Sequence, residues 1–252
     1  MTPLPFRRLA AWGVLLAFVA VARGEHPLIA KARAFVGPEE VLTAVKSVHY
    51  VGSLVTPDPT DAKKMTYVTV EIIVQDPYQQ RITASSDRSV EVTALDGYDA
   101  WHRVQDPKDS TRWRMQLLGT DQIKRLRANT WENLAFYRGL EREGGRVVDQ
   151  GDATKDGIAC RKLAFIHAGG VVFLRYFDAA TGRLVVTESE SGVSIREQGE
   201  IRVNGLRFPK SIVTATRGDD GREKSVTLTF DQITLNESFP ASTFAIPSLH
   251  SR

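Results

Sequence analysis

The sequence is poor in the residues that most catalytic and metal centres need. It contains one cysteine, Cys160, in 252 residues, so neither an intramolecular disulfide nor a cysteine-rich zinc site is possible. The five histidines include no His-Glu-x-x-His motif and no pair at metal-ligand spacing. A Gly-x-Ser-x-Gly elbow, a phosphate-binding loop and a dinucleotide fingerprint are also missing. We therefore expect a protein that is not an enzyme, with no catalytic residues, no metal site and no cofactor.

Most of the chain also lacks an excess of charge of either sign. The formal net charge is +3, from 33 basic and 30 acidic side chains. Three basic residues, Arg7, Arg8 and Arg23, precede the first acidic residue, Glu25, so the remainder of the chain is formally neutral. A broad basic surface for binding nucleic acid is therefore not expected.

The one long apolar run lies at the N-terminus. Leu9–Ala22 follows the pair Arg7-Arg8 and is shorter than the roughly 20 residues that span a membrane. Small residues at Ala22 and Gly24 suit signal peptidase, so residues 1–24 are expected to be a signal peptide cleaved after Gly24. No cysteine is close enough to carry a lipid anchor. The expectation is a soluble periplasmic protein, and an uncleaved N-terminal anchor is the alternative.

Helical patterns open the mature chain and interrupt it once. Apolar residues recur at helical spacing from Pro27 to Phe35 and again after Pro38. Between residues 119 and 140, Thr120 and Thr130 are predicted to cap two short helices. The second of these is expected to turn Trp131, Leu134 and Tyr137 inward, and Glu132 and Asn133 outward.

Most of the remaining chain alternates with a period of two. In residues 66–74, one face carries Val68, Val70, Ile72 and Val74, and the other Tyr67, Thr69 and Glu71. Similar segments separated by short turns continue to Leu235. About a dozen antiparallel strands are too many for a flat sheet. The sequence therefore predicts a mainly β fold, in which a single curved antiparallel sheet forms an unclosed barrel covered by helical segments.

Three segments carry a resemblance to a known family. They are Asp96-Gly97-Tyr98-Asp99-Ala100-Trp101, residues 175–184 (RYFDAATGRL) and residues 203–210 (VNGLRFPK). In this order, behind a signal peptide, they resemble the outer-membrane lipoprotein-sorting proteins of the LolA-like superfamily. The resemblance covers roughly residues 38–247, and no linker divides the chain, so residues 25–252 are expected to form a single LolA-like domain.

The resemblance implies an unclosed barrel whose space between sheet and helices takes up acyl chains. The sequence leaves two possibilities open, because the apolar helix stripes either fill the concave sheet completely or leave an apolar pocket. The residues predicted to line such a pocket are Val68, Val70, Ile72, Trp131, Leu134, Leu174 and Tyr176. The choice of strand face is a hypothesis. Trp101, Trp113 and Trp131 are candidates either for an aromatic patch or for the core.

The leading functional hypothesis is a soluble periplasmic protein that binds an acylated ligand, a lipoprotein or a lipid, in outer-membrane lipoprotein sorting. The alternative is an envelope sensor or adaptor that binds a membrane-protein partner without transport. The ligand, the partner and the oligomeric state are not specified by the sequence.

Overall fold

The computed structural model describes residues 26–57, 64–217 and 223–247. The predicted signal peptide therefore lies outside the described residues. The helices are α1 (Pro27–Val36), α2 (Glu39–Ala44) and α3 (Thr120–Ala135), with 3₁₀ turns η1 (Leu140–Glu143) and η2 (Ala241–Thr243). The strands are β1 (Ser47–Pro57), β2 (Met65–Gln75), β3 (Gln79–Ser85), β4 (Val90–Asp96), β5 (Asp99–Gln105), β6 (Trp113–Leu117), β7 (Arg146–Lys155), β8 (Ile158–Ile166), β9 (Val172–Asp178), β10 (Leu184–Ser189), β11 (Ser194–Gln198), β12 (Ile201–Val203), β13 (Leu206–Phe208), β14 (Ser211–Arg217) and β15 (Glu223–Leu235).

Thirteen of these strands form one antiparallel sheet in the order β6-β5-β4-β3-β2-β1-β15-β14-β11-β10-β9-β8-β7. The sheet is two meanders joined where the last strand, β15, pairs with the first, β1. The outermost strands, β6 and β7, do not pair with each other, so the barrel is not closed. This architecture confirms the predicted mainly β fold with an unclosed antiparallel sheet.

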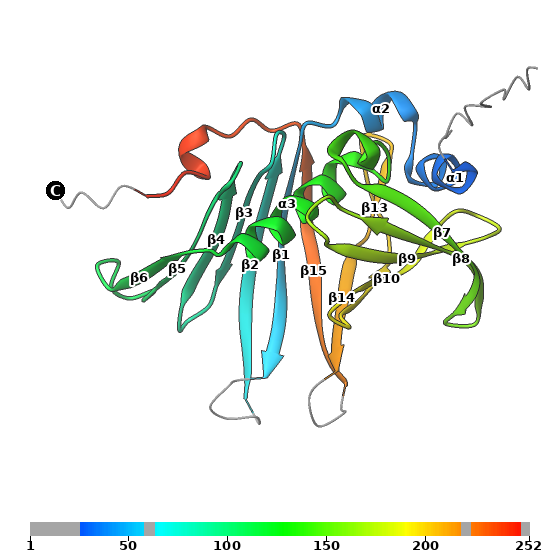
Figure 1. Cartoon of the computed structure of the whole chain (residues 1–252). Helices are drawn as coiled ribbons and strands as arrows, with labels where there is room; N and C mark the ends of the chain where they lie inside the picture. The colour runs from blue at the N-terminus through cyan, green and yellow to red at the C-terminus, as the bar shows by residue number, and fades with distance from the viewer. Residues whose placement is uncertain (1–25, 58–63, 218–222, 248–252) are drawn as a thin grey trace, which may run out of the picture.

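All three helices lie on the same side of the sheet, which we call the inner face (Figure 1). The strand register shows which side chains share it, because directly paired residues point to the same side. Tyr50 of β1 pairs with Ile72 of β2 and with Ile233 of β15, and Ile72 pairs with Ile82 of β3. The predicted alternation in β2 is confirmed, with Val68, Val70, Ile72 and Val74 on the inner face.

The insertion between residues 119 and 140 is one continuous helix rather than the two predicted. Thr120 is its first residue, and the Gln122 side chain accepts a hydrogen bond from the Gly119 N–H. Thr130 caps nothing, because its hydroxyl donates to the Leu126 carbonyl within the same helix. A threonine that bonds back four residues does not interrupt a helix, so α3 reaches across the strands that it covers (Figure 1).

Two long predicted strands are each divided in the structure. The segment around residues 193–203 splits at Gly199, whose φ is +66°, into β11 and β12. The segment around residues 208–217 splits at Pro209, which has no N–H for a ladder. The freed pieces β12 and β13 form a separate hairpin. The edge strand β6 was not predicted.

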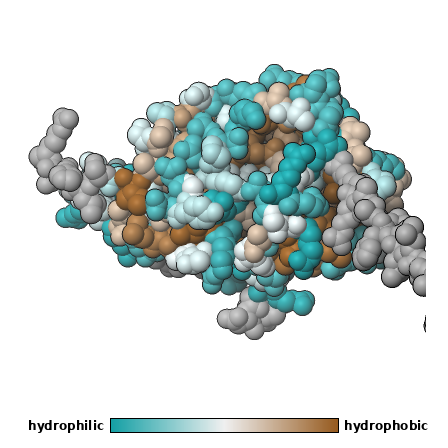
Figure 2. Space-filling model, turned by 45° about the horizontal axis from the view of Figure 1, so that its top comes forward, coloured by the Kyte–Doolittle hydropathy of each residue, from teal (hydrophilic) through white to brown (hydrophobic). Residues whose placement is uncertain are grey.

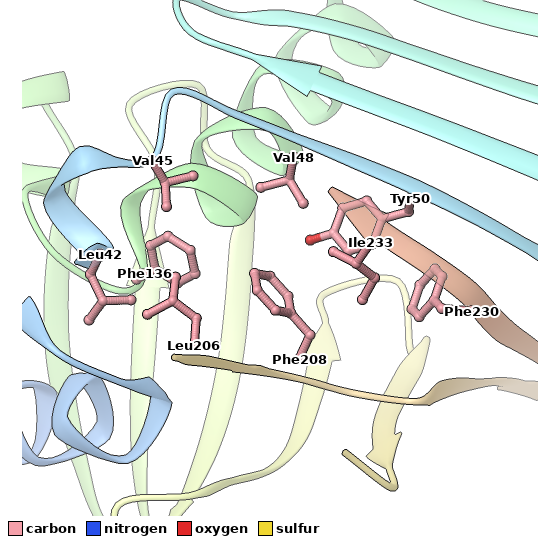
Figure 3. Packing of buried hydrophobic residues seen from close by; sticks show 9 residues of the cluster. All are labelled: Leu42, Val45, Val48, Tyr50, Phe136, Leu206, Phe208, Phe230 and Ile233. Carbon is pink, nitrogen blue, oxygen red and sulfur yellow. The ribbon is translucent and has the colours of Figure 1, made fainter. Parts of the chain in front are cut away.

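The largest cluster of buried side chains joins the inner face of the sheet to α2, to the end of α3 and to the β13 strand. Figure 3 shows its members pointing toward one another: Leu42, Val45, Val48, Tyr50, Phe136, Leu206, Phe208, Phe230 and Ile233. Tyr50 packs against Phe230 and Phe208 with ring centroids 5.0 and 6.2 Å apart. A second inner cluster fixes α1 to β8 and β9 through Leu28, Ile29, Ala32, Leu140, Leu163, Phe165 and Phe177.

The outer face of the sheet has its own cover near β5. The segment after β15 folds over it, and the indole N–H of Trp101 donates to the Phe244 carbonyl at 2.9 Å. Arg81 donates to the Thr243 carbonyl at 2.8 Å. Trp101 is therefore a core residue, 1% exposed, on the face opposite Trp131, while Trp113 is exposed on β6. The three tryptophans do not form a common patch.

The surface seen in Figure 2 is a mosaic in which hydrophilic residues surround smaller apolar patches. No helix among the described residues has the length and apolar character that crossing a membrane requires.

Gly52 of β1 pairs with Phe230 of β15, beside a β-bulge. A Cβ at this position would stand 2.2 Å from the Thr229 carbonyl oxygen. We expect Gly52→Ala to lower the free energy of unfolding by about 3 kcal/mol, because the clash is with backbone that cannot move aside cheaply. Ser53→Ala, one residue further, is the control and is expected to change it by less than about 0.5 kcal/mol. Urea unfolding measures both, and equal effects would contradict the expectation.

Candidate functional site

A cavity of about 350 Å³ lies between α3 and the inner face of the sheet. Its walls come from eight strands of the large sheet, from α3 and from the residues around Phe208, so it lies where the two meanders meet. The apolar part of its lining comprises Val36, Ile72, Phe136, Phe173, Leu184, Ile195, Phe208, Pro209, Ile212, Leu228 and Phe230. The helices therefore leave space under α3 instead of filling the concave sheet.

One wall of this cavity is charged. The guanidinium of Arg175, on β9, lies 2.5 Å from the carboxylate of Glu132, measured from Nη1 to Oε2, and each side chain is 7% exposed. The other Glu132 oxygen lies 2.7 Å from Nε2 of His167. The Arg175 guanidinium also stacks over Phe165 and Tyr137, 4.6 and 5.0 Å from their ring centres. This group links α3 to β9 across the cavity.

Glu197 of β11 lines the same cavity and a smaller one of about 150 Å³ beside it. The side chain of Glu197 is exposed to solvent, although protein atoms crowd around its carboxylate. Desolvation raises the pKa of this carboxyl above its ordinary value, and the positive charges of Arg175 and Arg183 offset part of that rise.

The predicted lining residues of β2 fall on the correct face, but only one reaches the cavity. Ile72 lines it. Val70 is buried further along the strand opposite Gly52, and Val68 is half-buried opposite Leu54. All three stay predictions as ligand contacts.

On α3 the prediction that Glu132 and Asn133 point outward was wrong, whereas Trp131, Leu134 and Tyr137 pack against the inner clusters as predicted. Glu132 and Asn133, predicted to point outward, line the central cavity. Trp131 and Leu134 line other openings, and Leu134 packs against the core cluster of Figure 3. The helix carries apolar residues on both sides, and its polar stripe is the one that faces the cavity, where Arg175 neutralises Glu132.

On β9 the predicted face is the outer one. Leu174 and Tyr176 pack with Cys160, Val185 and Val186 in a small cluster on the outer side of the sheet. Arg175, between them, points inward instead. The strand has apolar residues on both faces, so alternation alone did not identify the inner one. Cys160 is 2% exposed in that outer cluster, and burial raises the pKa of its thiol.

The helices that cover the cavity are joined by Arg33 of α1, which is 3% exposed. Its Nη1 donates to the carbonyls of Ala135 and Phe136 at 2.9 and 2.8 Å, at the end of α3. Its Nε and Nη2 donate to Glu39 of α2 at 2.8 and 2.7 Å. A cation at the C-terminal carbonyls of a helix also suits the helix dipole. One side chain thus connects all three helices.

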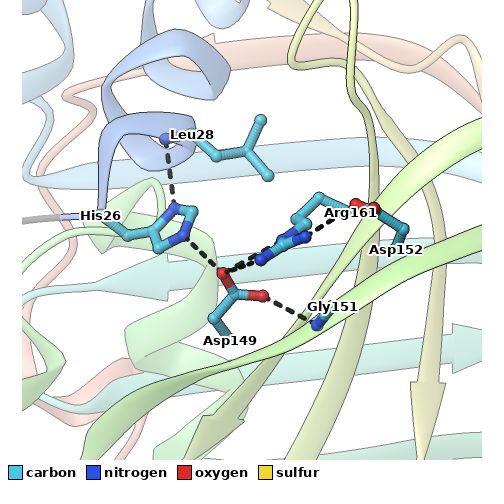
Figure 4. A network of polar contacts seen from close by, with 6 residues as sticks. All are labelled: His26, Leu28, Asp149, Gly151, Asp152 and Arg161. Carbon is cyan, nitrogen blue, oxygen red and sulfur yellow. Dashed lines mark hydrogen bonds and ion pairs between the residues drawn. The ribbon is translucent and has the colours of Figure 1, made fainter.

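A second polar network ties the start of α1 to β7 and β8 (Figure 4). His26 accepts a hydrogen bond from the Leu28 N–H at Nδ1, so its Nε2 donates to Asp149 at 3.0 Å. Arg161 donates to the same carboxylate at 2.8 and 3.0 Å, and the Gly151 N–H donates to its other oxygen at 2.8 Å. These hydrogen bonds, with that from Arg161 largest, hold the pKa of Asp149 well below its usual range.

We expect Asp149→Asn to lower the free energy of unfolding by about 1 kcal/mol at neutral pH, a small effect because the network is partly exposed. Since the folded-state pKa of Asp149 is depressed, its contribution is present above the unfolded pKa of about 3.9 and is lost as the pH falls below it. Urea unfolding of both proteins, from neutral pH to well below the unfolded pKa, is the measurement. A difference that persisted at the acidic end would contradict the assignment.

The described residues contain no group of three or more His, Cys, Asp or Glu side chains arranged to hold a metal ion.

No protein-family model matches the chain, and no curated protein matches it in sequence. Solved structures do match its fold. A LolA superfamily protein of Nitrosomonas europaea has a TM-score of 0.56 at 15% identity, over 87% of this chain and 96% of that one. A structure described as an outer membrane lipoprotein-sorting protein domain of Vibrio parahaemolyticus has a TM-score of 0.52 at 10% identity, over 86% and 95%. A DUF1329 family protein of Desulfovibrio piger has a TM-score of 0.53 at 9% identity, over 86% and 95%.

These matches cover nearly the whole of each compared structure, at sequence identities that show the fold alone. The chain has the LolA-like fold, as the sequence resemblance implied.

Proposed function

We propose, from the premise of a LolA-like fold, that this protein binds the acyl chain of a lipoprotein or lipid in the cavity beneath α3. The observation that carries the proposal is the cavity itself, whose apolar lining comes from both meanders of the sheet and from Phe136, the residue that follows α3. The lipoprotein-sorting description of the Vibrio parahaemolyticus structure supports the same class of ligand.

The energetics permit such binding without a charged contact. Burial contributes roughly 0.8 kcal/mol per methylene, so about ten methylenes contribute roughly 8 kcal/mol. Association then costs several kcal/mol in lost freedom. Dissociation constants in the micromolar range are within reach of a single acyl chain that enters this space.

The proposal includes export to the periplasm as one soluble domain of residues 25–252. Its support is the sequence pattern Arg7-Arg8, Leu9–Ala22 and Gly24, with no cysteine nearby. Intact-mass measurement of cell fractions tests it, and the expected product begins at Glu25. Full-length protein confined to the membrane fraction would contradict it.

Titration with N-phenyl-1-naphthylamine, a neutral apolar dye whose fluorescence rises out of water, tests the binding proposal. We expect saturable binding at one site, reversed by an added monoacyl lipid. No saturable signal up to the solubility of the dye would overturn the proposal. A crosslinked protein partner recovered together with that negative result would favour the sensor alternative.

A further inference from the structure

A second opening lies beside α3, away from the cavity beneath it. This second cleft, of about 580 Å³, is bounded by the first half of the helix and by the turns that precede β3, β5 and β9. Ile123, Arg127 and Trp131 line it, four residues apart and so on one face of the helix. Asn129 and Asn133, which line the cavity beneath α3, belong to a different face. The helix itself therefore separates the two openings.

Arg127 is fixed in position in the second cleft. Its guanidinium carbon lies 3.7 Å from the ring centre of Tyr78 and 4.0 Å from that of Tyr98. Its Nη1 donates to the Gly97 carbonyl at 2.8 Å, and within the described part of the chain the side chain makes no other hydrogen bond. Arg127 is half-buried, and its remaining N–H groups keep accessible surface. These groups are therefore donors that a ligand in the cleft can reach.

The charge of Arg127 is not neutralised by an ion pair with any of the described residues. The acid that lines the cleft, Glu143, instead accepts a hydrogen bond from the Tyr78 hydroxyl. Lys124, a second cation of the lining, is paired with Asp121 at 3.2 Å. Removal of Arg127 from bulk water strengthens its attraction for an anion. Because Arg127 supplies one positive charge and Glu143 repels further negative charge, the cleft favours a singly charged anion.

The rest of the lining suits the apolar body of an organic ligand. Ile123 and Trp131 of α3 line the cleft together with the rings of Tyr78 and Tyr98. The Trp131 ring is held edge-on against His167, with the ring centroids 5.5 Å apart. The volume also lies within the roughly 300–1,000 Å³ of ligand pockets. A ligand that has both a charge and an apolar body uses the lining more fully than an inorganic ion does.

We propose that the second cleft binds an organic anion with a single negative charge. Arg127 holds its carboxylate or sulfonate group, and its apolar body packs against Ile123 and Trp131. A planar guanidinium matches the oxygens of such a group with parallel N–H bonds, and the two tyrosine rings already fix its plane. This inference goes beyond the proposed function, because the site lies apart from the cavity beneath α3.

Two probes that differ by one sulfonate group test the inference. N-phenyl-1-naphthylamine is neutral, and 8-anilinonaphthalene-1-sulfonate has the same rings with a negative charge. We expect the sulfonate to bind a site from which the monoacyl lipid does not displace it. Arg127→Gln is expected to weaken this binding about tenfold, the scale of a lost charge-assisted hydrogen bond, and to leave binding of the neutral dye unchanged.

Arg125→Gln is the matched control, since it removes the same charge from the same helix, where Arg125 pairs with Glu190 at 2.8 Å. It is expected to bind the sulfonate as wild type does. So is Ile212→Trp, which places an indole in the cavity beneath α3. Wild-type affinity in a folded Arg127→Gln, or loss of the sulfonate together with the neutral dye in Ile212→Trp, would overturn the inference.

Two measurements on wild type do not depend on the folding of a variant. Added sodium chloride is expected to weaken binding of the sulfonate but not of the neutral dye, because salt screens the attraction to Arg127. Inorganic phosphate at equal ionic strength is expected not to displace the sulfonate, because it has no apolar body. Salt-independent affinity, or displacement by phosphate, would contradict the inference. Failure of the neutral dye alone to bind would overturn the acyl-binding proposal and leave this inference standing.

Discussion

In equilibrium unfolding with urea, Arg33→Ala is expected to lose about 3 kcal/mol of stability, within the range of large single-residue effects. The substitution removes the donors for two main-chain carbonyls at the end of α3, Ala135 and Phe136, and leaves them without that partner. Each unpaired buried acceptor costs about 1–3 kcal/mol. The ion pair with Glu39 contributes less, because Glu39 is 46% exposed and water replaces its partner.

Two further variants separate the ion pair with Glu39 from the hydrogen bonds to the end of α3. Glu39→Gln leaves the carbonyls of α3 bonded to Arg33 and is expected to cost about 1 kcal/mol or less. Arg33→Lys keeps a cation but loses the planar set of donors that reaches both helices, so its cost is expected to lie between the two. Equal losses of unfolding free energy in Arg33→Ala and Glu39→Gln would contradict this account. They would show that Arg33 stabilises the fold through its ion pair and not through its hydrogen bonds to the carbonyls at the end of α3.

Filling the cavity is expected to abolish most dye and lipid binding without loss of the fold. Ile212 of β14 is half-buried and points into the cavity between Glu197 and Leu228. The indole of Ile212→Trp occupies space that the acyl chain needs. If it displaces about three methylenes, the loss is roughly 2.4 kcal/mol, or about fiftyfold in affinity.

Val213→Trp is the matched control, since the next residue of the same strand points to the outer face. It is expected to bind the dye as wild type does. Far-ultraviolet circular dichroism and a urea transition establish that both variants are folded. Unchanged binding in a folded Ile212→Trp would place the ligand somewhere other than this cavity. A charge placed by Leu134→Arg tests the cavity less directly than Ile212→Trp does, because Leu134 packs against the core that holds α3 and its loss also affects folding.

The fold was predictable from the sequence where one pattern dominated a segment. The assignment of Val68, Val70, Ile72 and Val74 to one face of β2 and the helix start at Pro27 both appear in the structure as predicted. Prediction failed where two physical effects competed. Thr130 has the residue type of a helix cap, but its hydroxyl bonds to its own helix, so α3 continues through it.

The cavity was harder to predict than the sheet for a specific reason. On β9, apolar side chains point to both faces, and a charged residue between them is ordinarily read as solvent-facing. Arg175 instead points inward, because Glu132 from α3 compensates its charge at 2.5 Å. That pairing joins residues 43 positions apart in sequence, and no local pattern reveals it. One signal was available. Arg175 lies on β9, and the helix that covers this strand carries a polar stripe with Glu132, so the two charged residues could compensate each other.

The central claim is that an acyl chain occupies the cavity beneath α3, and the native protein tests it most directly. Protein purified from the periplasm without detergent is extracted with organic solvent, and the extract is examined by mass spectrometry beside that of Ile212→Trp prepared identically. The expected result is an acylated species near one per protein in wild type, strongly reduced in the folded variant. An extract from wild type without acylated species, or the same species at equal amount in both proteins, would contradict the claim.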